Sequence, residues 1–192
     1  LGVLEDQLGN FPEARAYYQE ALQKSSTTQD SVKAMQGQEA HFERLGQYTR
    51  SFEIAERRFK LMATFLPAAQ WKQVRVFTQV SKMAWTGRKD LYYRYLSDLK
   101  AELPQNAALF DCTGNYLFHM FAENSELFEQ FSDQCLDAYL VPMYGKAFKD
   151  LDMGVRLEMR EEFAESIQYY EAYTDSTGVG DLRMAYGMAG LY

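Results

Sequence analysis

Residues 8–22 read LGNFPEARAYYQEAL, and this stretch predicts two helices joined by a tight turn. A glycine directly after Leu8 suits the end of a helix, because the left-handed backbone found there costs little free energy only for glycine. Two residues later the aromatic Phe11 opens the next helix, and the small Ala14 lets two helices approach closely. The tyrosine pair at 17–18 is then predicted to lie on the buried face of the second helix.

The same spacing recurs further along the chain. Residues 45–59 read LGQYTRSFEIAERRF and residues 161–173 read EEFAESIQYYEAY, with Ser51 and Ser166 at the position of Ala14. Two weaker copies are predicted. Residues 85–99 have Tyr92 where a small residue is expected, and residues 121–136 lack the turn glycine and have Leu127 at the small position.

These residues resemble the tetratricopeptide repeat, whose signature is a Leu-Gly turn, an aromatic residue opening the second helix, and small residues at fixed positions of that helix. The resemblance implies an all-α fold: a right-handed superhelical solenoid of antiparallel helical hairpins, each burying one face on its neighbours. We expect one such solenoid over residues 1–192. Its units are predicted at about 1–25, 30–65, 68–102, 105–140 and 142–175, with the start of a further unit at 181–192.

The composition favours a soluble globular chain. Of its 192 residues 47% are hydrophobic and 24% are charged, both ordinary values for such proteins. It has no apolar run of about 18 residues, so we expect no membrane insertion within this segment. The net charge of −7 argues against nucleic acid as a partner. Because the chain starts without Met inside a repeat and stops inside an apolar helical pattern, we expect a fragment of a longer protein, whose compartment is left open.

Two alternatives remain for the two cysteines. Cys112 and Cys135 are too few for a disulfide scaffold, and two small buried hydrophobic side chains are the first expectation. If residues 106–121 and 126–140 form a helical hairpin, however, both cysteines lie about equally far from its turn. They would then sit side by side, and a disulfide is the alternative.

No catalytic motif stands out, so we predict no catalytic residue, no metal site and no cofactor. Neither His41 nor His119 belongs to an HxxxH or HExxH pattern, and the glycines at 178 and 180 lack the Lys-Ser or Lys-Thr of a phosphate-binding loop. Cys112 and His119 lie seven residues apart on one predicted helix face, where packing is favoured over a catalytic pair.

The resemblance implies that the first helix of each hairpin lines a concave groove that binds peptides or partner helices. Counting back from each turn by helical spacing gives the candidate groove residues. They are Lys33, Gln36, Arg44, Phe77, Ser81, Trp85, Tyr116, His119 and Glu158. Trp85 and Tyr116 are the strongest, because aromatic side chains anchor interfaces; the alternative is that they pack between helices.

The predicted function is therefore a protein-binding or peptide-binding scaffold without catalysis of its own. Long irregular repeats with a tyrosine-rich last unit (IQYYEAYTDS, residues 167–176) are similar to sensor regions of some bacterial histidine kinases and transcription regulators. This similarity implies a sensory or regulatory region of a larger bacterial signalling protein. The alternative is a structural assembly module, a homo-oligomer formed through open solenoid ends; a helical enzyme is a third, weaker hypothesis.

Overall fold

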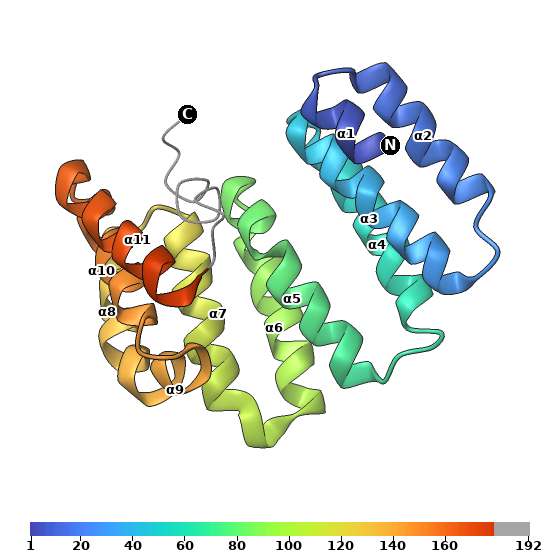
Figure 1. The fold of residues 1–192 in the computed structure, drawn as a ribbon. Helices are drawn as coiled ribbons and strands as arrows, with labels where there is room; N and C mark the ends of the chain where they lie inside the picture. Colours follow the sequence, from blue (N-terminus) through green and yellow to red (C-terminus); the bar gives the residue numbers. More distant parts are fainter. Residues whose placement is uncertain (179–192) are drawn as a thin grey trace. The chain divides into compact units, whose positions relative to one another are not determined.

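The computed structural model describes residues 1–178, and every regular element in this range is a helix (Figure 1). The all-α prediction is thereby confirmed, and the predicted start of a further repeat at 181–192 lies outside the described residues. None of the helices described combines the length and apolar character that a membrane crossing requires. The α-helices are α1 (Gly2–Gln7), α2 (Phe11–Gln23), α3 (Thr28–Arg44), α4 (Tyr48–Met62), α5 (Ala68–Trp85), α6 (Lys89–Glu102), α7 (Ala107–Phe121), α8 (Ser125–Cys135), α9 (Val141–Tyr144), α10 (Phe148–Met159) and α11 (Phe163–Thr177). A short 3-10 turn, η1 (Pro104–Asn106), precedes α7, and a π-helical turn, η2 (Leu136–Leu140), follows α8.

The chain divides into two compact units, and the first comprises Leu1–Arg75. Within it α1 packs on α2, α2 on α3 and α3 on α4. Ala55, Phe59 and Met62 of α4 form the centre of an apolar cluster that Trp71 joins from the start of α5. A buried ion pair crosses between α3 and α4, because Arg58 Nε donates to Glu39 Oε2 at 2.9 Å.

The second unit begins at Val76. Within its described part α7 packs on α6 and α8, and α10 packs on α8 and α11. The core is centred on α7, α8 and α10, and its fully enclosed members include Phe128 and Leu140.

A disulfide joins Cys112 of α7 to Cys135 of α8, so the expectation of two free buried thiols is wrong and its alternative is confirmed. The hairpin of α7 and α8 brings the two cysteines together. The helices turn at Glu123, the cysteines lie about equally far from it, and their Cα atoms are 5.5 Å apart.

Five helix-to-helix turns each have, at the same position, one residue with left-handed backbone. The glycines predicted at 9, 46 and 87 have φ values of 79°, 66° and 66°, which confirms the turns expected there. In the two copies without a turn glycine, Glu123 and Glu161 take the left-handed position with φ of 52° and 63°. Each turn is closed by two main-chain hydrogen bonds; Gly46 N–H, for example, donates to Glu43 O and Gln47 N–H to Phe42 O. The backbone geometry is thus kept where the glycine is not.

The fifth residue after each turn is enclosed in every copy. The five are Ala14, Ser51, Tyr92, Phe128 and Ser166, all with 0–2% of their surface exposed. The assignment of this position to Leu127 was therefore wrong by one residue. A large aromatic side chain fits this position where the facing helix has a glycine. Tyr92 faces Gly114 of α7, where an added Cβ would lie only 2.7 Å from Tyr92 Oη.

The tyrosine pairs are only half buried, which corrects the prediction for them. Tyr18 and Tyr170 are 7% and 0% exposed, whereas Tyr17 and Tyr169 are 37% and 38% exposed. Successive helical residues point about 100° apart, so one member of each pair must leave the packed face.

The left-handed turns give a stability prediction with opposite signs at two equivalent positions. Gly46→Ala should lower the free energy of unfolding by about 1 kcal/mol, because the added Cβ meets open space and the cost is that of the left-handed backbone alone. Glu161→Gly should raise it by about 0.5 kcal/mol, the relief of that strain less the greater freedom of an unfolded glycine. Urea denaturation of each variant measures both.

Glu162→Gly is the matched control, because Glu162 has an ordinary φ of −88°. It should not stabilise the protein. An equal gain from Glu162→Gly and Glu161→Gly would contradict the assignment of strain to the turn.

Candidate functional site

A groove opens in the first unit where α2 extends past α1. The six-residue α1 runs beside the first part of α2, and its Gly2 lies against the ring of Tyr18: a Cβ added there would sit 3.0 Å from the ring. Beyond that level α2 continues to Gln23 with α3 beside it. The groove has a volume of about 550 Å³. Its lining residues are Leu1, Gly2, Val3, Tyr17, Tyr18, Glu20, Ala21, Lys24, Ser25, Asp30, Lys33 and Ala34.

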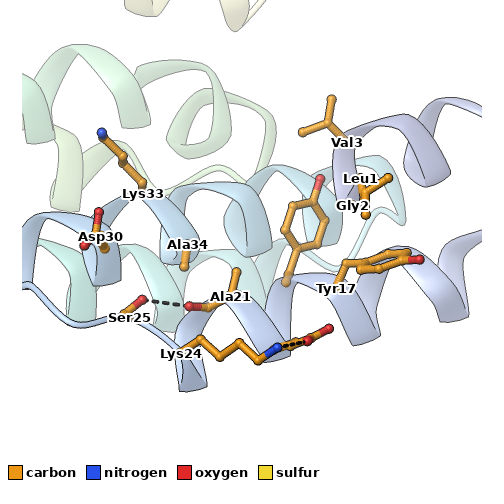
Figure 2. Close-up of a pocket in the computed structure, with 12 residues that line it drawn as sticks. Leu1, Gly2, Val3, Tyr17, Ala21, Lys24, Ser25, Asp30, Lys33 and Ala34 are labelled. Carbon is orange, nitrogen blue, oxygen red and sulfur yellow. Dashed lines mark hydrogen bonds and ion pairs between the residues drawn. The ribbon is translucent and has the colours of Figure 1, made fainter.

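The two ends of the groove differ in chemistry, as Figure 2 shows. Leu1, Val3 and Tyr17 lie at one end, and all three are exposed apolar side chains. Asp30 and Lys33 lie toward the other end, with Ala21 and Ala34 between the two groups, whereas the Lys24 side chain runs back below Ala21 toward Tyr17. Because these alanines project only a methyl group, the groove can admit another backbone or a bulky apolar side chain.

One cation at the polar end has no partner among the described residues. Lys24 pairs with Glu20, one turn earlier on α2. Asp30 accepts a hydrogen bond from Thr27 Oγ1 at the start of α3. Lys33 forms no ion pair or hydrogen bond with residues 1–178, so its ammonium group can receive a carboxylate from a bound partner.

The wall of the groove at Tyr18 is held by a buried carboxylate. Tyr18 Oη donates to Asp6 Oδ2 at 3.0 Å, and Arg44 donates to the same oxygen at 2.8 Å. His41 Nδ1 lies 2.5 Å from the other oxygen, Oδ1. Burial, together with the hydrogen bond to Asp6, raises the pKa of the Tyr18 hydroxyl, which therefore stays protonated and keeps donating. The hydrogen bonds at Asp6 thus hold Tyr18 in the wall of the groove.

The last hairpin repeats this tyrosine–carboxylate pair. Tyr170 Oη donates to Glu158 Oε2 at 2.5 Å, and the two residues are twelve apart, as Asp6 and Tyr18 are. Burial raises the pKa of the Glu158 carboxyl. Glu158, one of the residues predicted to line a groove, is thus half-buried and serves as an internal acceptor.

The sequence-predicted residues fall into both units, and only Lys33 lines the groove described above. In the first unit Gln36 is exposed elsewhere on α3, and Arg44 is exposed while bonded to Asp6. In the second unit the exposed member is Trp85, at 53%, with its ring edge-on to Phe121 at 5.8 Å.

Four other candidates of the second unit are withdrawn from solvent. Phe77 and Ser81 are half-buried, and Phe77 lies 6.3 Å from Phe110 between ring centres. Tyr116 is 1% exposed and packs between Phe128 and Phe148, so the alternative that it packs between helices is confirmed. His119 is 4% exposed and stacks on Phe131.

The surroundings of Cys112 and His119 also argue against a catalytic pair of these two residues. Cys112 carries no thiol, because it is bonded to Cys135. Burial, with a smaller contribution from Lys89, lowers the pKa of the His119 imidazole. His119 is therefore a neutral core residue that Tyr93 approaches at 3.4 Å.

Sequence reasoning missed the apolar end of the groove. Tyr17 was assigned to the core together with its neighbour, although the 100° step between them was a signal that one must face outward. Leu1, Val3 and Ala21 carried no such signal, because their exposure depends on where α1 lies along α2.

Within residues 1–178 no three His, Cys, Asp or Glu side chains gather into a metal-binding cluster. Comparisons with protein-family models, with curated proteins and with solved structures find no match to this chain. The residues and their geometry alone therefore indicate a function.

Proposed function

We propose that this chain is a protein-interaction module that binds a partner peptide or helix in the groove between α1, α2 and α3. The groove itself carries the proposal: it pairs exposed apolar side chains at one end with the unpartnered Lys33 at the other. Amphipathic helices bind such grooves through apolar residues spaced by one turn. The partner favoured here has two or three such residues followed by a carboxylate.

The wider role that we propose is the one suggested by the repeat resemblance. The chain acts as a tetratricopeptide-like scaffold without catalysis, in a sensory or regulatory region of a larger bacterial signalling protein. What supports this role is the recurring turn and small-residue spacing, together with the tyrosine-rich segment 167–176.

A direct test uses a fluorescein-labelled amphipathic peptide of twelve or so residues, with leucines one turn apart and two glutamates at one end. We expect saturable fluorescence anisotropy with the 192-residue chain. Ala21→Arg fills the groove from an exposed position and should abolish binding, and Lys33→Glu should weaken it about tenfold, the loss of one charge-assisted contact. Ala16→Arg is the matched control, because Ala16 is exposed on the same helix outside the groove.

Three outcomes would contradict the proposal. One is the absence of saturable binding, and another is an equal effect of Ala16→Arg and Ala21→Arg. The third is binding by this chain that disappears in a longer form of the protein, because preceding residues then occupy the groove. Light scattering tests the assembly alternative: growth with protein concentration that Ala21→Arg suppresses would favour oligomerisation.

A further inference from the structure

A second cavity lies in the first unit, among α2, α3 and α4, with a volume of about 220 Å³. It faces the side of α2 opposite the groove, since Arg15, Gln19 and Leu22 line the cavity while Tyr17, Ala21 and Lys24 line the groove. Tyr18 lies between these two faces and contributes to both. The complete lining is Arg15, Tyr18, Gln19, Leu22, Gln38, His41, Phe42 and Arg57.

The cavity is cationic at its rim. Arg15 and Arg57 are exposed, and neither forms an ion pair with a described residue. The guanidinium carbon of Arg15 lies 6.0 Å from the centre of the Phe42 ring. None of the residues that line the cavity is acidic. Two guanidinium groups at one small cavity repel each other unless an anion lies between them, and their planar donor sets suit oxyanions.

One of the residues that line the cavity, His41, has an imidazole nitrogen with an unused hydrogen-bonding capacity. His41 is 1% exposed, and its Nε2 has no hydrogen-bond partner among the described residues. Its Nδ1 lies 2.5 Å from Asp6 Oδ1, and a carboxylate oxygen accepts. Nδ1 therefore carries the hydrogen, and in a neutral imidazole this makes Nε2 an acceptor. A buried acceptor left without a donor costs free energy, so a ligand that supplies a donor is favoured.

We propose that this cavity binds inorganic phosphate, an oxyanion that keeps an O–H group at neutral pH. Its anionic oxygens accept from Arg15 and Arg57, with the amides of Gln19 and Gln38 as further donors, and its O–H donates to His41 Nε2. Donors from three helices surround the cavity, which suits a tetrahedral anion better than a planar carboxylate. This site is separate from the peptide groove, since only Tyr18 lines both, and the two are linked through Asp6, which bonds to both Tyr18 and His41.

The test is a titration of the 192-residue chain with sodium phosphate at constant ionic strength, followed by the ¹⁵N resonances of the His41 imidazole. We expect a saturable shift of Nε2. Sulfate, which has the same shape but no O–H at neutral pH, should bind about tenfold more weakly, and Arg15→Gln or Arg57→Gln should each weaken phosphate binding about tenfold. Arg50→Gln is the matched control, because Arg50 also lies over Phe42, at 5.7 Å, but does not line the cavity.

The outcomes separate specific binding from general attraction. The absence of a saturable shift, equal binding of sulfate and phosphate, or an equal effect of Arg50→Gln and Arg57→Gln would each overturn the proposal. A phosphoserine peptide at pH 8 carries a phosphate without the O–H and should bind more weakly than inorganic phosphate. Tighter binding of the peptide would overturn free phosphate as the ligand and identify a phosphorylated partner as the source.

Discussion

Asp6→Ala is expected to lower the free energy of unfolding by about 3 kcal/mol, because it removes a buried acceptor shared by three side chains and leaves their donors unpaired. Those donors are Tyr18 Oη, His41 Nδ1 and an Arg44 guanidinium nitrogen, which come from α2 and α3. One carboxylate on a six-residue helix thus ties three helices together. Urea denaturation followed by circular dichroism measures the change.

The neighbouring Glu5 supplies the matched control. Its carboxylate accepts an exposed hydrogen bond from Asn10, which precedes α2, so Glu5→Ala should cost well below 1 kcal/mol, the range of exposed polar contacts. Tyr18→Phe removes one of the three donors and should fall between the two variants. A loss for Glu5→Ala as large as for Asp6→Ala would mean that α1 stabilises the unit only by its helical packing.

Reduction of the Cys112–Cys135 disulfide is expected to cost about 3 kcal/mol, the loop-closure entropy for a separation of this length. The two cysteines are 23 residues apart in sequence, and the bond closes the α7–α8 hairpin inside the core of the second unit. Urea denaturation with and without a phosphine reductant measures the difference.

The double variant Cys112→Ala/Cys135→Ala should unfold at the same urea concentration in both conditions. A thiol titration of the unfolded, unreduced wild-type chain should count no free thiol. Two free thiols, or denaturation curves that reductant leaves unchanged, would contradict the bond.

The sequence predicted the helical hairpins well because their turns depend on local chemistry. Gly9, Gly46 and Gly87 have left-handed backbone, which few other residues adopt at low cost in free energy. Their common place in the repeated spacing therefore indicates the same turn at each. The turns at Glu123 and Glu161 were located only through the spacing of the other copies. Local rules therefore predicted the all-α character correctly. They also located the enclosed position five residues after each turn, with an error of one residue at Phe128.

The candidate site was much less predictable, because it depends on contacts between helices. Tyr116 fits the spacing of a groove residue, yet Phe128 and Phe148 enclose it. The groove lies beside the part of α2 that α1 does not contact, and residues 15, 38 and 57 line the second cavity together with His41. The spacing of these residues in the sequence predicts neither the groove nor the cavity. How the hairpins stack over the whole chain stays a prediction.

The two main-chain hydrogen bonds that close each left-handed turn have a mechanical consequence. In all five, one N–H at the left-handed residue and one at the next residue are tied to carbonyls of the preceding helix. To separate the two helices at such a turn, both main-chain hydrogen bonds must break together, so the turn resists opening of the helix pair. The connection between α2 and α3, residues 24–27, contains no left-handed residue of this kind. A partner that binds beside α2 would therefore meet α1 and α2 held together by the turn at Gly9, with Asp6 joining both helices to α3.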